Sequence, residues 1–227
     1  MLIVIGFLLS IFFTILFRYV SPPITPLMVL RGWNMWQTDG VYKVDKEWVP
    51  LREMSAHLPV AVISSEDQKF LFHYGFDWDA IQKAWQNNSN PNRKHLKGGS
   101  TISQQVAKNV FLWPDRTWLR KGFEAYFTLL IEIFWPKERI LEVYLNVIET
   151  GNGVYGVERI SQACFSKSAK HLSKEEAALI VATIPNPRLW SPCTPNFYIH
   201  NRKNNILKAM GNVNRVFKYS KSAQNKK

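Results

Sequence analysis

A short apolar run that ends in two adjacent carboxylates constrains this chain more than any other feature. The run, Leu58–Ile63, predicts the buried start of a helix, and Glu66–Asp67 stand where it would continue inward. If the helix continues, Glu66, Phe70 and His73 lie at i, i+4 and i+7 on one stripe. Gly75 is then placed to end that helix. An amphipathic surface helix with solvated carboxylates would give the same pattern.

Length and composition favour one globular domain with an appendage. The chain has 227 residues, of which 46% are hydrophobic, so it can bury a full core. Nine Trp in an aromatic fraction of 14% indicate contact with a membrane interface or with sugar rings. The net charge of +12 indicates an anionic partner, which is a nucleic acid, an acidic lipid or a phosphate. Cys164 and Cys193 are either paired or free thiols, and no Cys/His cluster has the spacing of a zinc site.

The N-terminal segment is apolar enough to suggest a membrane anchor. Leu2–Phe17 carries only two small polar residues, and a spanning helix needs ~20 residues. No small-x-small cleavage site follows, so we expect residues 1–20 to form an uncleaved transmembrane helix. We expect residues 21–54 to be a linker or membrane-proximal segment with short extended pieces. Residues 55–200 then form a mainly helical domain, and residues 201–227 a basic helix and tail.

A glycine pair introduces a second polar segment with the features of a binding site. Gly98 and Gly99 precede Ser100, and such glycines let the backbone approach a ligand closely. Thr101 and Gln104 fit a capping box for the helix that follows. On that helix Thr101, Gln105 and Lys108 share one face, which suits a phosphate or a sugar. An ordinary capped surface helix is the alternative, whereas the spacing excludes a nucleotide P-loop.

A cation cluster follows one helix later. Arg116, Arg120 and Glu124 are spaced by four, with Lys121 beside them. As structure, these are i, i+4 ion pairs that contribute only ~0.3–0.5 kcal/mol each. As function, they form an anion site with a carboxylate kept ionised. The buried face of this helix is predicted to consist of apolar residues: Phe123, Tyr126, Phe127, Leu130 and Ile131.

Taken together, these segments resemble the family 51 glycosyltransferases, the peptidoglycan polymerising domains of bacteria. The family pattern Glu-Asp-x-x-Phe-x-x-His-x-Gly matches the stretch from Glu66 to Gly75. The block Gly-Gly-Ser-Thr-Ile-Thr-Gln-Gln matches Gly98–Gln105, with Ser103 where Thr is usual. Arg-Lys-x-x-Glu matches Arg120–Glu124, and Lys-x-x-Ile-Leu-Glu-x-Tyr-Leu-Asn matches Lys137–Asn146. The segment around Cys164 departs from the family pattern, and this puts local packing in doubt rather than activity.

The resemblance implies a lysozyme-like helical fold and a polymerising reaction. Such an enzyme extends a lipid-linked glycan from lipid II, with inversion at the anomeric carbon and release of undecaprenyl pyrophosphate. It implies Glu66 as the base and catalytic roles for Asp67 and Glu124. It implies that the substrate is bound by these residues: Phe70, His73, Gly99, Ser100, Thr101, Gln104, Gln105, Lys108, Arg116, Arg120 and Lys121. No Ser-x-x-Lys occurs in the chain, so no transpeptidase activity is expected.

The resemblance also implies cofactors, partners and a location. Glu124 either organises the cation cluster or binds a divalent cation, Mg²⁺ or Mn²⁺, that bridges the phosphates; no organic cofactor is expected. The expected partners are lipid II, the growing glycan and the membrane, with cell-division or cell-wall synthesis proteins as further candidates and no nucleic acid. The expected location is the bacterial inner membrane, with one span and a periplasmic catalytic domain. The rival interpretations are a lysozyme-like hydrolase or lytic transglycosylase, and a non-catalytic membrane scaffold.

Overall fold

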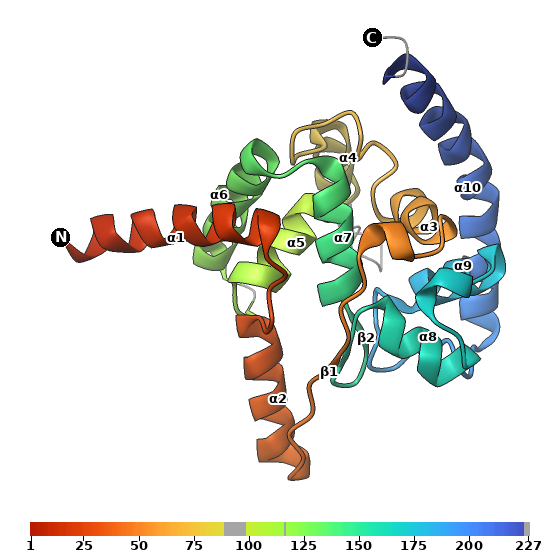
Figure 1. The fold of residues 1–227 in the computed structure, drawn as a ribbon, viewed down its shortest axis with the longest axis horizontal. Helices are drawn as coiled ribbons and strands as arrows, with labels where there is room; N and C mark the ends of the chain where they lie inside the picture. The colour runs from red at the N-terminus through yellow and green to blue at the C-terminus, as the bar shows by residue number, and fades with distance from the viewer. Residues whose placement is uncertain (89–98, 116, 225–227) are drawn as a thin grey trace.

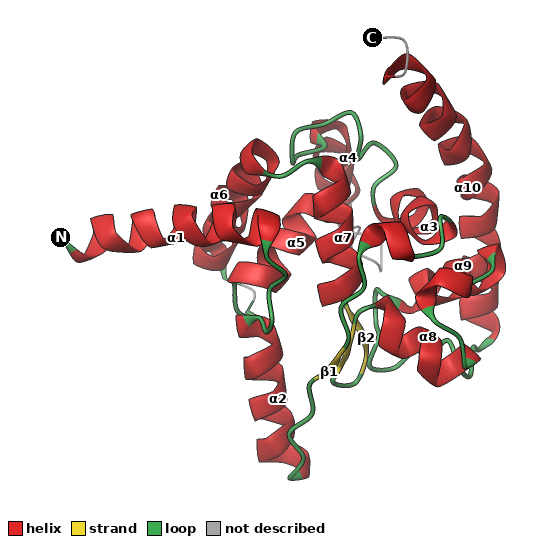
Figure 2. Ribbon diagram, in the orientation of Figure 1, coloured by secondary structure: helices red, strands yellow, loops and turns green. Residues whose placement is uncertain are grey.

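The computed structural model describes residues 1–88, 99–115 and 117–224, and helices dominate it (Figures 1 and 2). The α-helices are α1 (Leu2–Tyr19), α2 (Pro26–Asp39), α3 (His57–Glu66), α4 (Trp78–Asn88), α5 (Ile102–Phe111), α6 (Trp118–Phe134), α7 (Lys137–Val147), α8 (Val157–Phe165), α9 (Lys174–Thr183) and α10 (Phe197–Gln224). Two short 3₁₀ helices, η1 (Leu51–Glu53) and η2 (Ala169–His171), connect them. The mainly α fold class predicted from the sequence is confirmed.

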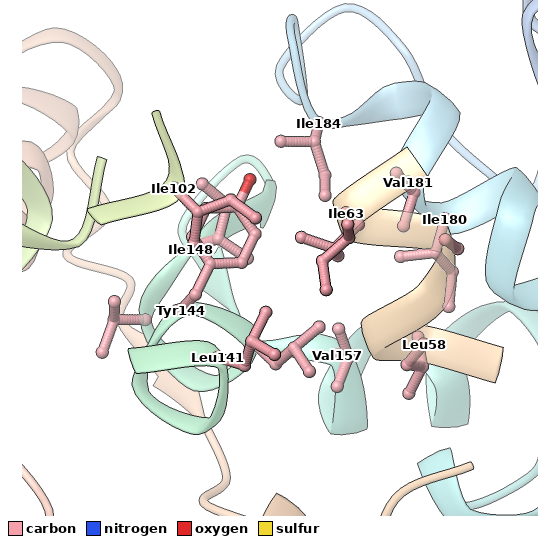
Figure 3. Packing of buried hydrophobic residues seen from close by; sticks show 14 of the residues in the cluster. Leu58, Ile63, Ile102, Leu141, Tyr144, Ile148, Val157, Ile180, Val181 and Ile184 are labelled. Atoms are coloured by element: carbon pink, nitrogen blue, oxygen red, sulfur yellow. The ribbon is translucent and has the colours of Figure 1, made fainter. Parts of the chain in front are cut away.

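The core surrounds α3, whose apolar run is buried as predicted. Leu58 and Ile63 are almost inaccessible to solvent. Helix α3 packs against α9 and α10 on one side of the molecule, while α5 packs against α6 and α7 on the other. Figure 3 shows Ile63 of α3 between Val181 of α9 and Tyr144 of α7. The same cluster therefore holds the two halves of the domain together on either side of α3.

A small sheet lies beside α7 and α8. Its strand order is β1 (Asp45–Lys46), β3 (Val154–Tyr155), β2 (Glu149–Gly151), with β1 parallel and β2 antiparallel to β3. The Gly-rich stretch after α7, residues 151–156, thus forms the hairpin between β2 and β3 and its exit. At Gly153, φ is +69°, and a Cβ there would lie 2.8 Å from the Lys43 carbonyl oxygen.

The segment between residues 21 and 54 contains a helix that the sequence analysis did not predict. Thr25 caps α2 by accepting a hydrogen bond from the Met28 amide at 3.3 Å. Met28 and Met35 are buried on the side that packs against α5. Helix α1 lies against α6. Among the described residues, no helix combines the length and the apolar character required to cross a membrane.

Two local predictions were wrong, and one open question is answered. Helix α3 ends at Glu66, where the Asp67 backbone becomes extended with φ at −161°. Glu66, Phe70 and His73 therefore do not share a helical stripe, and Gly75, at φ +87°, lies in a loop rather than at a helix end. The question of the two cysteines is answered by a disulfide, which joins Cys164 of α8 to Cys193.

The buried face of α6 also differs from the prediction. Its buried residues are Arg120, Glu124, Thr128 and Ile131, a stripe that is polar except at its end. The aromatic face predicted to be buried instead lines a groove of about 890 Å³ between α6 and α1, and Phe123 is 42% exposed. Periodicity shows that a helix has an apolar face but does not show what covers that face.

Candidate active site

Glu66 is the last residue of α3, and three side chains hold its carboxylate. The Ser65 hydroxyl donates to Oε1 at 3.0 Å, and the Gln105 amide donates to Oε2 at 3.1 Å. The Arg202 guanidinium of α10 lies 3.5 Å from Oε1 and 3.1 Å from the Ser65 hydroxyl. The Glu66 side chain is 13% exposed, so it is fixed but still reaches solvent. This combination suits a group that must accept a proton from a bound hydroxyl.

The Gln105 amide is oriented from behind by Tyr144 of α7. The Tyr144 hydroxyl donates to the Gln105 side-chain oxygen at 3.3 Å, which leaves the amide nitrogen pointing at Glu66. Tyr144 is fully buried, and burial, followed by the nearby Glu66 charge, raises the pKa of its hydroxyl well above the ordinary value of 10.0. Tyr144 therefore stays a neutral donor at any physiological pH.

Asp67 joins three parts of the chain. Its carboxylate lies 2.9 Å from His73 Nε2 and accepts a hydrogen bond from the Ile102 amide, at the start of α5, at 3.1 Å. Asp67 is 7% exposed, and Phe70 is completely buried beneath the His73 ring. The structure therefore places Asp67, Phe70 and His73 behind the site, where they position α5 relative to Glu66.

The start of α5 has the predicted capping box. The Thr101 hydroxyl accepts a hydrogen bond from the backbone N–H of Gln104, and the side-chain oxygen of Gln104 accepts one from the backbone N–H of Thr101. Thr101 and Gln104 are both buried, and the Thr101 hydroxyl also donates to the Gly75 carbonyl at 2.6 Å. Gly99 packs closely on α4, since a Cβ there would lie 3.4 Å from the Ala80 carbonyl oxygen. Gly98 lies outside the described residues.

The predicted cation cluster is present around Glu124. The Arg120 guanidinium donates to Glu124 Oε2 at 2.6 Å, and the Lys121 ammonium contacts Oε1. Lys121 also reaches the Ser100 hydroxyl at 3.5 Å, which connects the cluster to the loop before α5. Glu124 is 3% exposed, whereas the Lys121 side chain is 41% exposed. The predicted member Arg116 lies outside the described residues.

Lys108 lies one turn after Gln105 on α5 and faces this cluster. It has no hydrogen bond or ion pair within the described part of the chain. Burial is the main cause that lowers the pKa of Lys108, and the charges of Arg120, Arg31 and Lys121 lower it further, against the opposing effect of Glu124. Helix α5 therefore presents Gln105 to the carboxylate Glu66 and Lys108 to a net positive cluster.

Several contributors to the site were not among the site residues expected from the sequence. Arg202 contacts Glu66 from a helix 136 positions later in the chain, and Arg31 of α2 lies near enough to Lys108 for its charge to lower the pKa of that ammonium. Glu132 is buried in contact with Ser103 and with Lys137 at 2.8 Å, and Lys137 also donates to the His73 carbonyl at 2.7 Å. The charges near the C-terminus predict only a basic helix and tail, and nothing in their spacing singles out Arg202.

The described residues contain no cluster of three or more His, Cys, Asp or Glu side chains that could hold a metal ion. Both carboxylate oxygens of Glu124 already accept from cationic side chains. A carboxylate that is paired twice with cations has little capacity left for a hard cation such as Mg²⁺. The residues present do not fit a metal held by Glu124, and they supply positive charge at that place themselves.

Comparison with known proteins identifies the family to which this chain belongs. The model of the family described as Transglycosylase matches residues 34–211. The chain belongs to the transglycosylase family. A biosynthetic peptidoglycan transglycosylase of Bdellovibrio bacteriovorus is 51% identical over 205 residues, which are 90% of this chain and 81% of the relative. Relatives with the same name in Rhodospirillum centenum and Bacteroides thetaiotaomicron are 50% and 45% identical, covering 92% and 100% of this chain and 87% and 90% of the relatives.

Proposed function

We propose that this peptidoglycan glycosyltransferase of cell-wall synthesis polymerises lipid II into glycan strands. One observation carries the proposal: a single helix, α5, contacts the carboxylate Glu66 through Gln105 and faces the cation cluster through Lys108. A base for a sugar hydroxyl and a cationic site for a pyrophosphate leaving group are the two elements that the reaction requires. Gln105 and Lys108 are about one helical turn apart on α5, so the base and the cationic site are close neighbours along this helix.

The proposed step is a single displacement. Glu66 takes the proton of the acceptor 4-hydroxyl as its oxygen forms a bond to the donor anomeric carbon. The bond from that carbon to the phosphate oxygen breaks, and the pyrophosphate leaves with the electron pair, so the configuration inverts. Lys108, Arg120 and Lys121 stabilise the negative charge that develops on the leaving group. Arg116 stays a predicted member of this group.

The groove between α1 and α6 supports a place for the polyprenyl tail of the substrate. It is lined by Phe7 and Ser10 of α1 and by Trp118, Leu119 and Phe123 of α6, and Trp118 is 91% exposed. It lies beside the α6 turn that carries Arg120 and Lys121, so a lipid in the groove would present its phosphates to them. A cell-envelope location agrees with the family. We propose in addition that α1 anchors the chain in the inner membrane, with the catalytic domain on the periplasmic side.

The cation cluster favours this transferase over a glycan hydrolase. A hydrolase also uses carboxylates near an oxocarbenium-like transition state, but its leaving group is a sugar alcohol that needs no cluster of cations. Glu124, which could have served as a second catalytic carboxylate, is buried and ion-paired. We assign it the role of holding Arg120 and Lys121 in place. A divalent cation on the pyrophosphate stays a prediction, and no step proposed here depends on it.

The experiment is polymerisation of lipid II by the full chain in detergent, read as a ladder of glycan strands. Glu66→Gln keeps the side-chain size and removes the base, so we expect no strands from it. Glu53→Gln is the matched control and should polymerise normally, because Glu53 is exposed on η1 and its ion pair is with the exposed Arg52. Strands from Glu66→Gln at the wild-type rate would remove Glu66 as the base. Cleavage of preformed glycan without polymerisation would move the chain to the hydrolases.

A further inference from the structure

Arg31 is a cation placed on the buried side of α2. It follows Leu27 by four residues and precedes Met35 by four, so all three lie on one face of the helix. Leu27 and Met35 are buried, and this face packs against α5. Arg31 itself is half-buried. The fold therefore directs a guanidinium towards the helix that carries Lys108.

Arg31 has no counter-charge in the described part of the chain. Its Nε is buried without a hydrogen-bond partner, and the described residues provide no ion pair for it. The carboxylate of Glu149, which lies in the same region near Tyr155, is paired with Arg188 at 3.2 Å. Burying a charged group without a partner is costly, and an anionic ligand that pairs with the guanidinium would offset that cost.

The neighbouring cations have the same imbalance. Lys108 has no hydrogen bond or ion pair to any residue that the structure describes, and the Arg31 charge is near enough to contribute to the lowered pKa of its ammonium. Arg120 and Lys121 share one carboxylate, that of Glu124. Lys108, Arg120 and Lys121 thus lie around one carboxylate, that of Glu124, and the Arg31 charge acts on Lys108 from the α2 side. An anion with two or more charges would balance these cations.

We propose that Arg31 is a further pyrophosphate-binding residue, supplied to the cation cluster by α2 and contacting the diphosphate of the lipid-linked substrate. The inference rests on the proposed function, because it takes the diphosphate from that reaction. Arg31 precedes residue 34, at which the match to the family model begins, so the family match does not include it. The N-terminal segment then does more than lead to the catalytic domain, since it completes the anion site.

The test measures binding of inorganic pyrophosphate to the full chain in detergent by titration calorimetry. Arg31→Gln should weaken binding about tenfold, the effect of losing one charge-assisted contact of about 1.4 kcal/mol. Arg31→Lys, which keeps the charge, should recover most of the affinity. The matched control is Arg52→Gln, which removes the same charge from a side chain that is 84% exposed, and it should bind within twofold of the wild type.

Thermal unfolding of each variant checks that it is folded. If Arg31→Gln does not fold, Arg31→Met keeps the apolar stem against α5 and carries the same test. A folded variant that binds pyrophosphate as tightly as the wild type overturns the inference. So does weakened binding to phosphatidylglycerol vesicles with unchanged pyrophosphate affinity, because Arg31 would then face lipid head groups. Failure of the wild type to make glycan strands counts instead against the proposed function.

Discussion

At the scale of single residues, Lys108 shows how the site prepares for an anion. Lys108 is partly buried near Arg31, Arg120 and Lys121, and burial acts with these charges to lower its pKa from the ordinary 10.5. The charged form therefore costs stability in the empty site. A bound diphosphate would supply the missing counter-charge and offset that cost. Folding of the empty protein therefore favours the neutral amine of Lys108, whereas binding of the diphosphate favours its ammonium form.

The expected consequence is a pH dependence specific to Lys108. Pyrophosphate affinity should fall as pH rises through the lowered pKa, because the ammonium is lost earlier than from an ordinary lysine. Stability of the empty protein should rise between that pKa and 10.5, where the unfolded chain binds the extra proton. Calorimetric titrations with pyrophosphate and urea unfolding, each at several alkaline pH values, measure both trends.

Lys108→Ala should bind pyrophosphate about tenfold more weakly at neutral pH and should lose both pH trends. Lys83→Ala, on the exposed side of α4, is the control. If Lys108→Ala keeps the wild-type profile, the titrating group is another one.

The residues that the sequence identified correctly are those whose chemistry is local. The Thr101–Gln104 capping box and the Arg120–Glu124 pair lie within four positions of one another, so spacing was enough to predict them. Arg202 contacts Glu66, and the Arg31 charge acts on Lys108, from helices far away in the chain. No periodicity encodes such a contact, since it depends on how α10 and α2 pack.

At the scale of secondary-structure elements, the start of α5 both ends a loop and fixes the site. The Thr101 hydroxyl caps the helix and also binds the Gly75 carbonyl, while the Ile102 amide binds Asp67. The loop after α3 and the helix α5 are therefore tied at their meeting point. These contacts therefore also fix the position of Gln105, one turn further along α5, relative to Glu66.

Two capping boxes in the chain allow these roles to be separated. Thr101→Ala and Ser173→Ala each remove a cap hydroxyl, and each should lower the free energy of unfolding by about 1 kcal/mol or somewhat more. Only Thr101→Ala should also reduce the rate of glycan polymerisation, because Ser173 caps α9 away from Glu66. Urea unfolding and initial rates measure the two effects. Equal rates for the two folded variants would contradict a positioning role for the start of α5.

The elements also show the limit of pattern reading. The stripe of α6 that is buried carries Arg120, Glu124 and Thr128, whereas Phe123 faces the groove beside α1. An apolar face predicts burial only when water is the alternative environment. In a protein that handles a lipid substrate, the same pattern also fits a face reserved for apolar ligands.

At the scale of the whole molecule, the site depends on parts of the chain that lie far apart in sequence. Helix α3 carries the carboxylate Glu66, α5 carries Lys108, and α6 carries Arg120 and Lys121. Helix α10 passes beside α3 (Figure 1), and its Arg202 contacts Glu66. The placement of α10 depends on its packing against α3 and α9. The disulfide between Cys164 and Cys193 constrains the same region, because it ties α8 to the segment just before α10.

Removing this disulfide should affect stability more than chemistry. It closes a loop over a sequence separation of 29, and restricting such a loop in the unfolded chain contributes ~3.6 kcal/mol in the chain-entropy description. The double variant Cys164→Ser/Cys193→Ser should therefore have a free energy of unfolding lower by that amount and a lower urea midpoint, and reduced wild type should match it. Polymerisation per folded molecule should fall by less than half, because the contacts of α10 with α3 and α9 still hold Arg202 against Glu66. A loss of activity as complete as that of Glu66→Gln, in variant protein that is still folded, would instead mean that the disulfide itself holds α10 at the site.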